Sequence, residues 1–183
     1  DTKAIETHIR GILEAIGEDP DREGLRETPQ RVARMYEEIF AGISYSNHEI
    51  AEMFGKTFEA PSPSQSQTAV VMKDISVFSY CEHHMALMYD MNVNVAYVPR
   101  GRVIGLSKIA RICDMASKRL QLQDGWDIAE ILMEAVGTPD VGVVITGSHS
   151  CMTARGIRNV SSRTTTKTFC GAFQTDRSLQ ELL

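Results

Sequence analysis

The spacing of the apolar residues changes along the chain, and the order of these changes restricts the folds that the chain can adopt. Four segments have the spacing of amphipathic helices: residues 5–16, 32–40, 107–123 and 128–136. Four others have the alternation or the β-branched content of strands: residues 68–80, 87–98, 141–146 and 163–173. From residue 68 onward, the predicted order is therefore strand, strand, helix, helix, strand, strand.

This order predicts an α+β protein with a four-stranded antiparallel sheet. The two helices lie between strands two and three and cover one face of the sheet. Residues 61–67, Pro-Ser-Pro-Ser-Gln-Ser-Gln, predict an exposed loop. This loop divides a helical N-terminal region, 1–67, from a sheet-containing catalytic domain, 68–183. The edges of such a sheet are exposed, so we expect it to associate with other copies of the chain.

Composition and charge argue against several classes of protein. The chain has 183 residues and a formal net charge of −5, which disfavours a general nucleic-acid-binding protein. No apolar run reaches membrane-spanning length, and residues 1–6 lack the pattern of a signal peptide. The cysteines, at positions 81, 113, 151 and 170, favour a metal site over disulfides, because histidines stand beside two of them. We therefore expect a cytoplasmic protein without a membrane segment.

Two Cys/His pairs point to a metal site. Cys81 and His84 have the C-x-x-H spacing of ligands that converge across a tight turn, and His149 and Cys151 are two residues apart just after a predicted strand. Thiolate and imidazole ligands together favour zinc. Two other interpretations remain: buried cysteines with hydrogen-bonded histidines, or a closed structural Cys2His2 site. Spacing leaves three candidate histidines, because His83 stands beside His84.

The predicted helix that begins at Ser107 has the features of an anion site. Ser107 is a natural N-cap, and Lys108 and Arg111 lie in the first turn, where cations oppose the helix dipole unless an anion binds. Free N–H groups, a hydroxyl and two cations together suit a phosphate. Arg155, four residues after Cys151, would bring another cation near the metal. The alternative is a solvated charged helix face.

Several motifs occur in the order found in one known family. They are Glu18–Leu25, Thr28–Tyr36, Cys-Glu-His-His at 81–84, Val-Ala-Tyr-Val-Pro at 95–99, Gly-Leu-Ser-Lys-Ile-Ala-Arg at 105–111, His-Ser-Cys-Met-Thr-Ala-Arg-Gly-Ile at 149–157 and Arg163–Thr168. Together they resemble GTP cyclohydrolase I over nearly the whole chain. The resemblance implies the tunnelling fold and a toroidal homodecamer with active sites between subunits. It also implies conversion of GTP and water to 7,8-dihydroneopterin triphosphate and formate.

The same resemblance implies roles for the metal-site residues. The zinc ligands match Cys81, His84 and Cys151, which leaves a fourth position for water. Zinc lowers the pKa of bound water to roughly 7 and so supplies hydroxide at neutral pH. His149 is then expected to protonate the purine nitrogen while C8 is attacked, and His83 to assist through the metal-bound water.

Resemblance also implies substrate-binding residues. The triphosphate would be held by Lys108, Arg111 and Arg155. Ser107 would serve the later ribose rearrangement. Arg31 matches a position that reaches a neighbouring subunit's site, and Arg34 is expected to do likewise. The residues alone would make Arg31 part of a solvated helix face.

The chain departs from the family pattern at Leu120–Ile128. Gln123 matches a substrate-binding position, but Asp124 stands where the family has a glutamate that binds the guanine edge. The stretch is also about two residues shorter, or roughly 200° of helix rotation, so we expect Gly125 to break the helix. Trp126 would either pack against the core or cover the base pocket. An altered helix phase would turn Asp124 to solvent and let Asp127 or Trp126 face the pocket.

Three functions follow from these observations. The first is an active GTP cyclohydrolase I. The second is a cyclohydrolase of the same fold that acts on a different purine, because the base-binding carboxylate is altered. The third is a non-catalytic zinc-containing binding protein. The two histidines that zinc does not need favour the enzymes.

Overall fold

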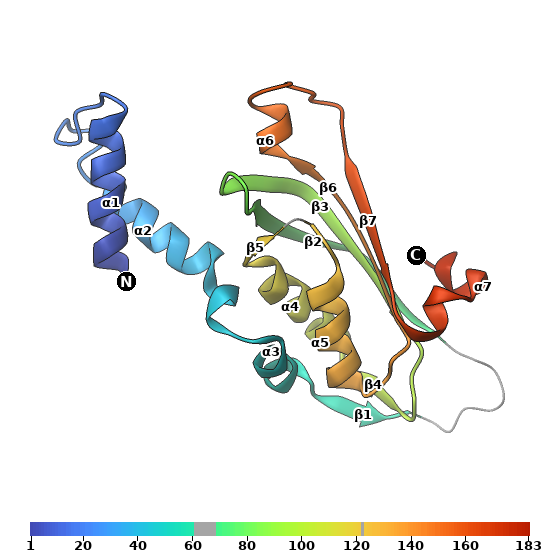
Figure 1. Ribbon diagram of the computed structural model, residues 1–183. Coiled ribbons are helices and arrows are strands. Elements are labelled where there is room, and N and C mark those ends of the chain that lie inside the picture. Colours follow the sequence, from blue (N-terminus) through green and yellow to red (C-terminus); the bar gives the residue numbers. More distant parts are fainter. Residues whose placement is uncertain (61–68, 122) are drawn as a thin grey trace. The chain divides into compact units, whose positions relative to one another are not determined.

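The computed structural model describes residues 1–60, 69–121 and 123–183 (Figure 1). The predicted loop at 61–67 lies outside the described residues. The chain divides into two compact units, Asp1–Ala41 and Gly42–Leu183. The predicted domain boundary after residue 67 stays a prediction. Among the described residues, none of the helices combines the length and the hydrophobicity that a bilayer crossing requires.

The first unit is a helical pair. Helix α1 spans Thr2–Ala15 and packs against α2, which spans Thr28–Ile39. The Asp1 side chain caps α1 by accepting a hydrogen bond from the Ala4 N–H. In the connection between the helices, Asp21 accepts two hydrogen bonds from the Arg10 guanidinium, at 3.0 and 2.7 Å. This connection is therefore tied back to α1.

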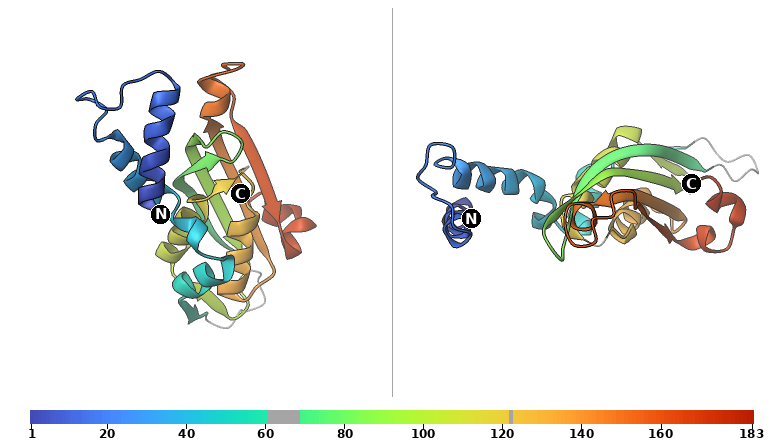
Figure 2. Two further views of the ribbon diagram at one scale, coloured as in Figure 1. Left: turned by 60° about the vertical axis from the view of Figure 1, so that its left-hand side comes forward. Right: turned by 90° about the horizontal axis from the view of Figure 1, so that it is seen from above.

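The second unit is built on one twisted and curved sheet (Figure 2). Its strands, in spatial order, are β5 (Leu120–Gln121), β2 (Val70–Cys81), β3 (Ala86–Tyr97), β6 (Val141–His149) and β7 (Thr164–Phe169). The pairs among β2, β3, β6 and β7 are antiparallel, which confirms the predicted four-stranded α+β sheet. The short β5 is an addition that pairs parallel with β2.

Two helices between β3 and β6 pack on one face of the sheet, as predicted. Helix α4 spans Leu106–Ser117 and contacts β2, whereas α5 spans Trp126–Val136 and contacts β6 and β7 (Figure 1). Apolar side chains from these helices and from the inward side of the strands form the main core. The remaining elements are η1 (Ala41–Ser44), α3 (Asn47–Phe54), β1 (Thr57–Glu59), β4 (Arg102–Ile104), α6 (Ser150–Thr153), η2 (Gly171–Gln174) and α7 (Arg177–Gln180).

Two predicted elements are longer than the observed ones. Helix α4 ends at Ser117 instead of near residue 123, because Leu120 and Gln121 pair with the end of β2. Strand β7 ends at Phe169 instead of 173. Gly171 has a φ of +56°, and a Cβ there would lie 2.3 Å from Asp140 Oδ1, so the chain turns tightly at a glycine.

Arg119 fixes the connection between α4 and α5. Its guanidinium donates to the main-chain oxygens of Gly42 and Tyr45, to Asn47 Oδ1 at 2.6 Å and to Asp127 Oδ2 at 2.9 Å. This network joins the end of α4 to the starts of α3 and α5. Arg119 therefore fixes the start of the connection that leads from α4 to α5.

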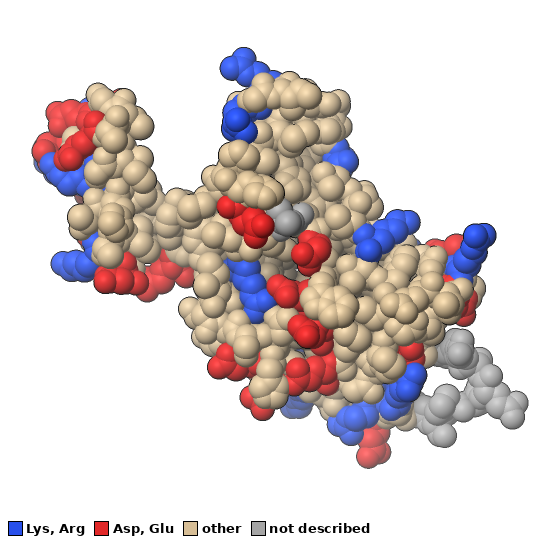
Figure 3. Space-filling model, viewed as in Figure 1, with Lys and Arg blue, Asp and Glu red and all other residues tan. Residues whose placement is uncertain are grey.

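Charge is unevenly distributed on the visible face of the second unit. Figure 3 shows Asp and Glu side chains gathered over α3 and α5. These helices carry exposed Glu49, Glu52 and Glu130. Such a surface repels phosphate groups.

Candidate metal centre and active site

Three predicted zinc ligands lie together at one end of the sheet. Cys81 is the last residue of β2, His84 lies in the turn to β3, and Cys151 lies in α6, directly after β6. Both β2 and β6 pair with β3, so their ends meet. The three ligand atoms all lie within 4.8 Å of one another.

The chemistry of this cluster fits a metal ion. Two thiols and one imidazole are the donor set that zinc-type ions prefer, and three ligands leave a position open for catalysis. All four cysteines of the chain are free thiols. Burial and the contact with Cys81 raise the pKa of the Cys151 thiol. A metal ion would replace the thiol protons of this cluster.

Two further side chains border the cluster. His83 is exposed, and its Nδ1 lies 4.0 Å from Cys81 Sγ. Arg155, which follows α6, places Nη1 3.1 Å from His84 Nε2. The structure therefore brings His83 and Arg155 beside the ligands, while their catalytic and phosphate-binding roles stay predictions.

His149 lies outside the group of possible metal ligands found among the described residues. It ends β6 and places Nε2 2.6 Å from Oε1 of Gln123. Partial burial lowers the pKa of its imidazole. This contact joins a candidate catalytic residue to a predicted substrate-binding residue, and no pattern in the sequence predicts it.

The predicted phosphate-binding residues of α4 are spread over the first half of that helix. Ser107 is the second helical residue instead of the N-cap, which is Gly105. The twelve residues of α4 span about 17 Å. The last residue, Ser117, accepts a hydrogen bond from Ser79, two residues before Cys81. Ser107 and Lys108 therefore lie near the end of α4 that is far from Ser79, whereas Arg111 lies in the middle of the helix.

Where the chain departs from the family pattern, Gly125 makes a close contact with the sheet. A Cβ at Gly125 would lie 3.0 Å from both Thr168 Oγ1 and Val143 Cγ1, so a larger residue would push the segment away from β6 and β7. Asp124 is exposed, and its Oδ1 accepts from the N–H of Trp126, the first residue of α5, at 3.1 Å. Trp126 is 52% exposed, so it does not pack into the core. Its role at the base stays a prediction.

The other predicted site residues are paired with protein groups or exposed to solvent. Asp127 is engaged by Arg119 and Asn47, so its carboxylate has protein partners. Arg31, in α2, pairs with Glu27 at 2.6 Å and is exposed, as is Arg34. The binding roles of Arg31 and Arg34 stay predictions.

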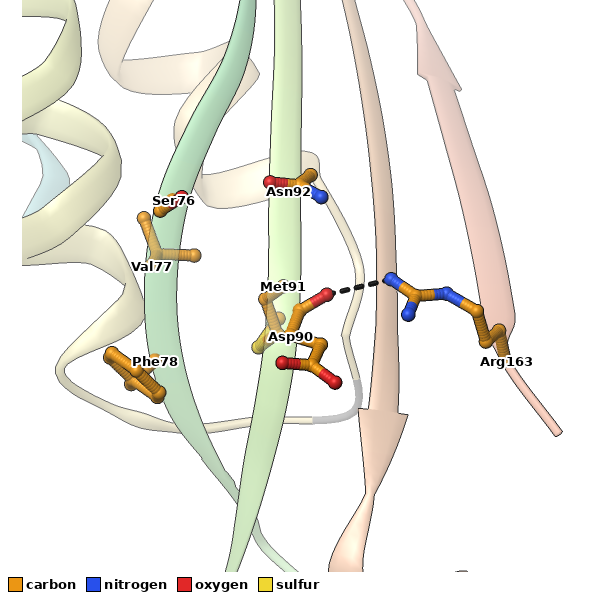
Figure 4. Close-up of a pocket in the computed structure, with 7 residues that line it drawn as sticks. All are labelled: Ser76, Val77, Phe78, Asp90, Met91, Asn92 and Arg163. Atoms are coloured by element: carbon orange, nitrogen blue, oxygen red, sulfur yellow. Dashed lines mark hydrogen bonds between the residues drawn. The ribbon is translucent and has the colours of Figure 1, made fainter. Parts of the chain in front are cut away.

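A shallow hollow of about 400 Å³ lies on β2 and β3. It is lined by Ser76, Val77, Phe78, Asp90, Met91, Asn92 and Arg163. Figure 4 shows Arg163 reaching across to the main-chain oxygen of Asp90, at 2.8 Å. None of the predicted site residues lines this hollow.

Comparison with known proteins decides the family. A model of the family described as GTP cyclohydrolase I matches residues 5–183. The chain belongs to the GTP cyclohydrolase I family. This match confirms the family resemblance and, with it, the predicted tunnelling fold.

Curated members of the GTP cyclohydrolase I family are similar over nearly their whole length. A protein from Clostridium acetobutylicum named GTP cyclohydrolase 1 is 60% identical over 182 residues, which cover 98% of this chain and 93% of the relative. One of the same name from Ruminiclostridium cellulolyticum is 60% identical over 187 residues, covering 100% and 96%. Another from Clostridium botulinum is 57% identical over 180 residues, covering 96% and 92%.

Proposed function

We propose that this chain is a GTP cyclohydrolase I, a hydrolase that converts GTP and water to 7,8-dihydroneopterin triphosphate and formate. The observation that carries the proposal is the convergence of Cys81, His84 and Cys151, with His149 nearby but outside that group. A structural metal site has no need of additional histidines. The names of the relatives described above point to the same substrate.

The proposed metal is Zn²⁺, held by Cys81, His84 and Cys151. When bound, it lowers the pKa of a coordinated water so that hydroxide is available at neutral pH. The exposed imidazole of His83, whose Nδ1 lies 4.0 Å from Cys81 Sγ, would act as the base for water at this site. His149 donates a proton to the purine nitrogen as C8 is attacked. Ser107 is assigned to the later ribose rearrangement.

The proposed triphosphate site combines residues of different chains. Along α4, Lys108 lies about 14 Å and Arg111 about 9 Å from Ser117, at the end that approaches their own metal cluster. Arg155 lies beside that cluster. A neighbouring subunit that supplies the start of its α4 would bring all three cations to one nucleotide. This supports a toroidal homodecamer, in which Arg31 and Arg34 of the first unit also reach an adjacent site.

The cations predict a strong dependence on the phosphates of the substrate. Replacing Arg111 by glutamine (Arg111→Gln) should weaken GTP binding about 10- to 100-fold, because a hydrogen bond to a charged group contributes about 1.5–3 kcal/mol. Guanosine should bind poorly to both proteins, and added salt should reduce the preference for GTP. Titration calorimetry measures both ligands. Arg177→Gln, on exposed α7, is the control, and equal binding of guanosine and GTP would contradict the phosphate site.

Asp124 favours a second candidate function, a cyclohydrolase for another purine, because its carboxylate is shorter than the family's glutamate. If Asp124 binds N1–H and the exocyclic amine of guanine, Asp124→Asn should lower kcat/KM for GTP by about 100-fold or more. The Oδ1 of asparagine can accept the same hydrogen bond from the Trp126 N–H, so the free energy of unfolding should barely change.

The Asp124 experiment compares GTP, ITP and ATP in the wild type and in the variant. Asp114→Asn, at an exposed position of α4, is the control. Formate and pterin fluorescence from GTP alone would support the proposed function. Turnover of another purine with none of GTP would establish the second function, and turnover of none would leave a binding protein. An Asp124→Asn variant that keeps wild-type kinetics would remove Asp124 from base recognition.

A cytoplasmic location is also part of this proposal. The four cysteines are free thiols, the state that reducing compartments maintain.

A further inference from the structure

Gln123 has an unusual environment for a residue that is expected to bind substrate. It is fully buried, with 0% of its surface exposed, and its φ is +69°. A residue other than glycine keeps this strained conformation only where its surroundings hold it. Here Thr166 Oγ1 donates to the main-chain oxygen of Gln123 at 2.6 Å. The main chain at Gln123 is therefore held against β7.

The hydrogen bonds of the Gln123 amide define its orientation. Nε2 lies 2.8 Å from the main-chain oxygen of Thr164 and 3.3 Å from that of Ile145. Carbonyl oxygens only accept, so the NH₂ group must face them. Oε1 then faces His149 Nε2 at 2.6 Å. Because Oε1 also only accepts, His149 Nε2 must carry a hydrogen.

We propose that Gln123 is a positioning residue, which holds His149 in the Nε2–H tautomer, and that its side chain does not bind the guanine base. This inference rests on the proposed function, in which His149 is the proton donor. Both amide hydrogens and Oε1 of Gln123 already have protein partners, which leaves little capacity for a ligand.

The proposal fixes which nitrogen of His149 transfers the proton. Because the Nε2–H of His149 is held by Gln123 Oε1, Nδ1 is the nitrogen left to exchange a proton with the purine. When the proton passes from Nδ1 to the purine nitrogen, the electron pair of the broken N–H bond stays on Nδ1, and a later transfer in the reverse direction returns the proton. Without the glutamine, the ring could rotate or adopt the other tautomer.

The test uses the metal-loaded protein and two variants. Gln123→Met removes the amide at similar size, and Gln123→Glu keeps an oxygen that accepts from His149. We expect Gln123→Met to lower kcat by about 10- to 100-fold, less than the loss of a whole general acid. KM for GTP, the GTP-to-ITP preference and the metal content should stay unchanged. Gln123→Glu should keep more of kcat than Gln123→Met.

A spectroscopic measurement makes the test independent of turnover. With ¹⁵N-labelled histidine, solid-state NMR should show the neutral His149 ring with hydrogen on Nε2 in the wild type, and a mixture of tautomers in Gln123→Met. His149→Gln identifies the signal. Gln180→Met is the matched control, because Gln180 also donates to two main-chain oxygens, of Phe173 and Gln174, away from the site.

Two results would overturn the inference. One is a wild-type His149 with hydrogen on Nδ1 alone. The other is a Gln123→Met variant with normal kcat, a raised KM and lost discrimination against ITP, which is the behaviour of a base-binding residue. If the wild type releases no formate from GTP, the proposed function fails, but the tautomer of His149 still tests the role of Gln123. If Gln123→Met does not fold, the Gln123→Glu variant and the wild-type spectrum still test the inference.

Discussion

Cys151→Ala is expected to lose both the bound metal and ring opening, so that formate release from GTP falls below detection. The cluster has three ligand atoms within 4.8 Å of one another, and removal of one leaves a thiol and an imidazole. Two ligands hold zinc far more weakly than three, and the hydroxide that attacks C8 is lost with the ion. Elemental analysis of the purified protein and a formate assay measure the two effects.

Cys113→Ala is the matched control for this prediction. Cys113 is fully buried in α4, and burial raises the pKa of its thiol to about 12, so it remains protonated at neutral pH. The Cys113→Ala variant should lose only packing contacts, which lowers its free energy of unfolding, and it should keep one metal ion per chain. A Cys151→Ala protein that keeps both the metal and formate release would contradict the proposed ligand set.

The second large effect is expected from His149→Ala. This variant should keep its metal and lose about 10²- to 10⁴-fold in ring opening, the usual cost of removing a positioned general acid. His149 lies outside the ligand group, so the metal content separates this variant from Cys151→Ala. The measurements are elemental analysis and single-turnover formate release.

His48→Ala provides the histidine control. His48 lies on α3, where it contacts Glu134 and Glu52. We expect this variant to keep wild-type turnover and metal content. Near-normal formate release by His149→Ala would remove that residue from the mechanism. Loss of the metal from His149→Ala would make the histidine a fourth ligand and the site a closed one.

The fold could be predicted from the sequence wherever a pattern was local and long enough. The strands β2 and β3 each have twelve residues; the β-branched and aromatic content of β2 and the apolar alternation of β3 predicted them. The C-x-x-H spacing of Cys81 and His84 likewise predicted a tight turn. By contrast, β5 has only two residues and forms by pairing with the end of β2. Two residues are too few to show the alternation that predicts a strand.

The candidate site was less predictable because its contacts join distant parts of the chain. Gln123 meets His149, Ile145 and Thr164, all more than twenty positions away, and only the sheet brings them together. Of the two positions predicted for Trp126, the core is wrong, because Gly125 makes the close approach to β6 and β7 and Trp126 begins α5 half exposed. A position over the base stays a prediction.

The measurement that tests the central proposal most directly follows the carbon that the reaction removes. GTP labelled with ¹³C at C8 is incubated with the metal-loaded wild type, and the products are resolved by NMR. The proposed function predicts that all of the label appears in formate, with one unlabelled dihydroneopterin triphosphate formed for each formate. Label that stays in an intact purine, with the metal bound and the protein folded, would contradict it.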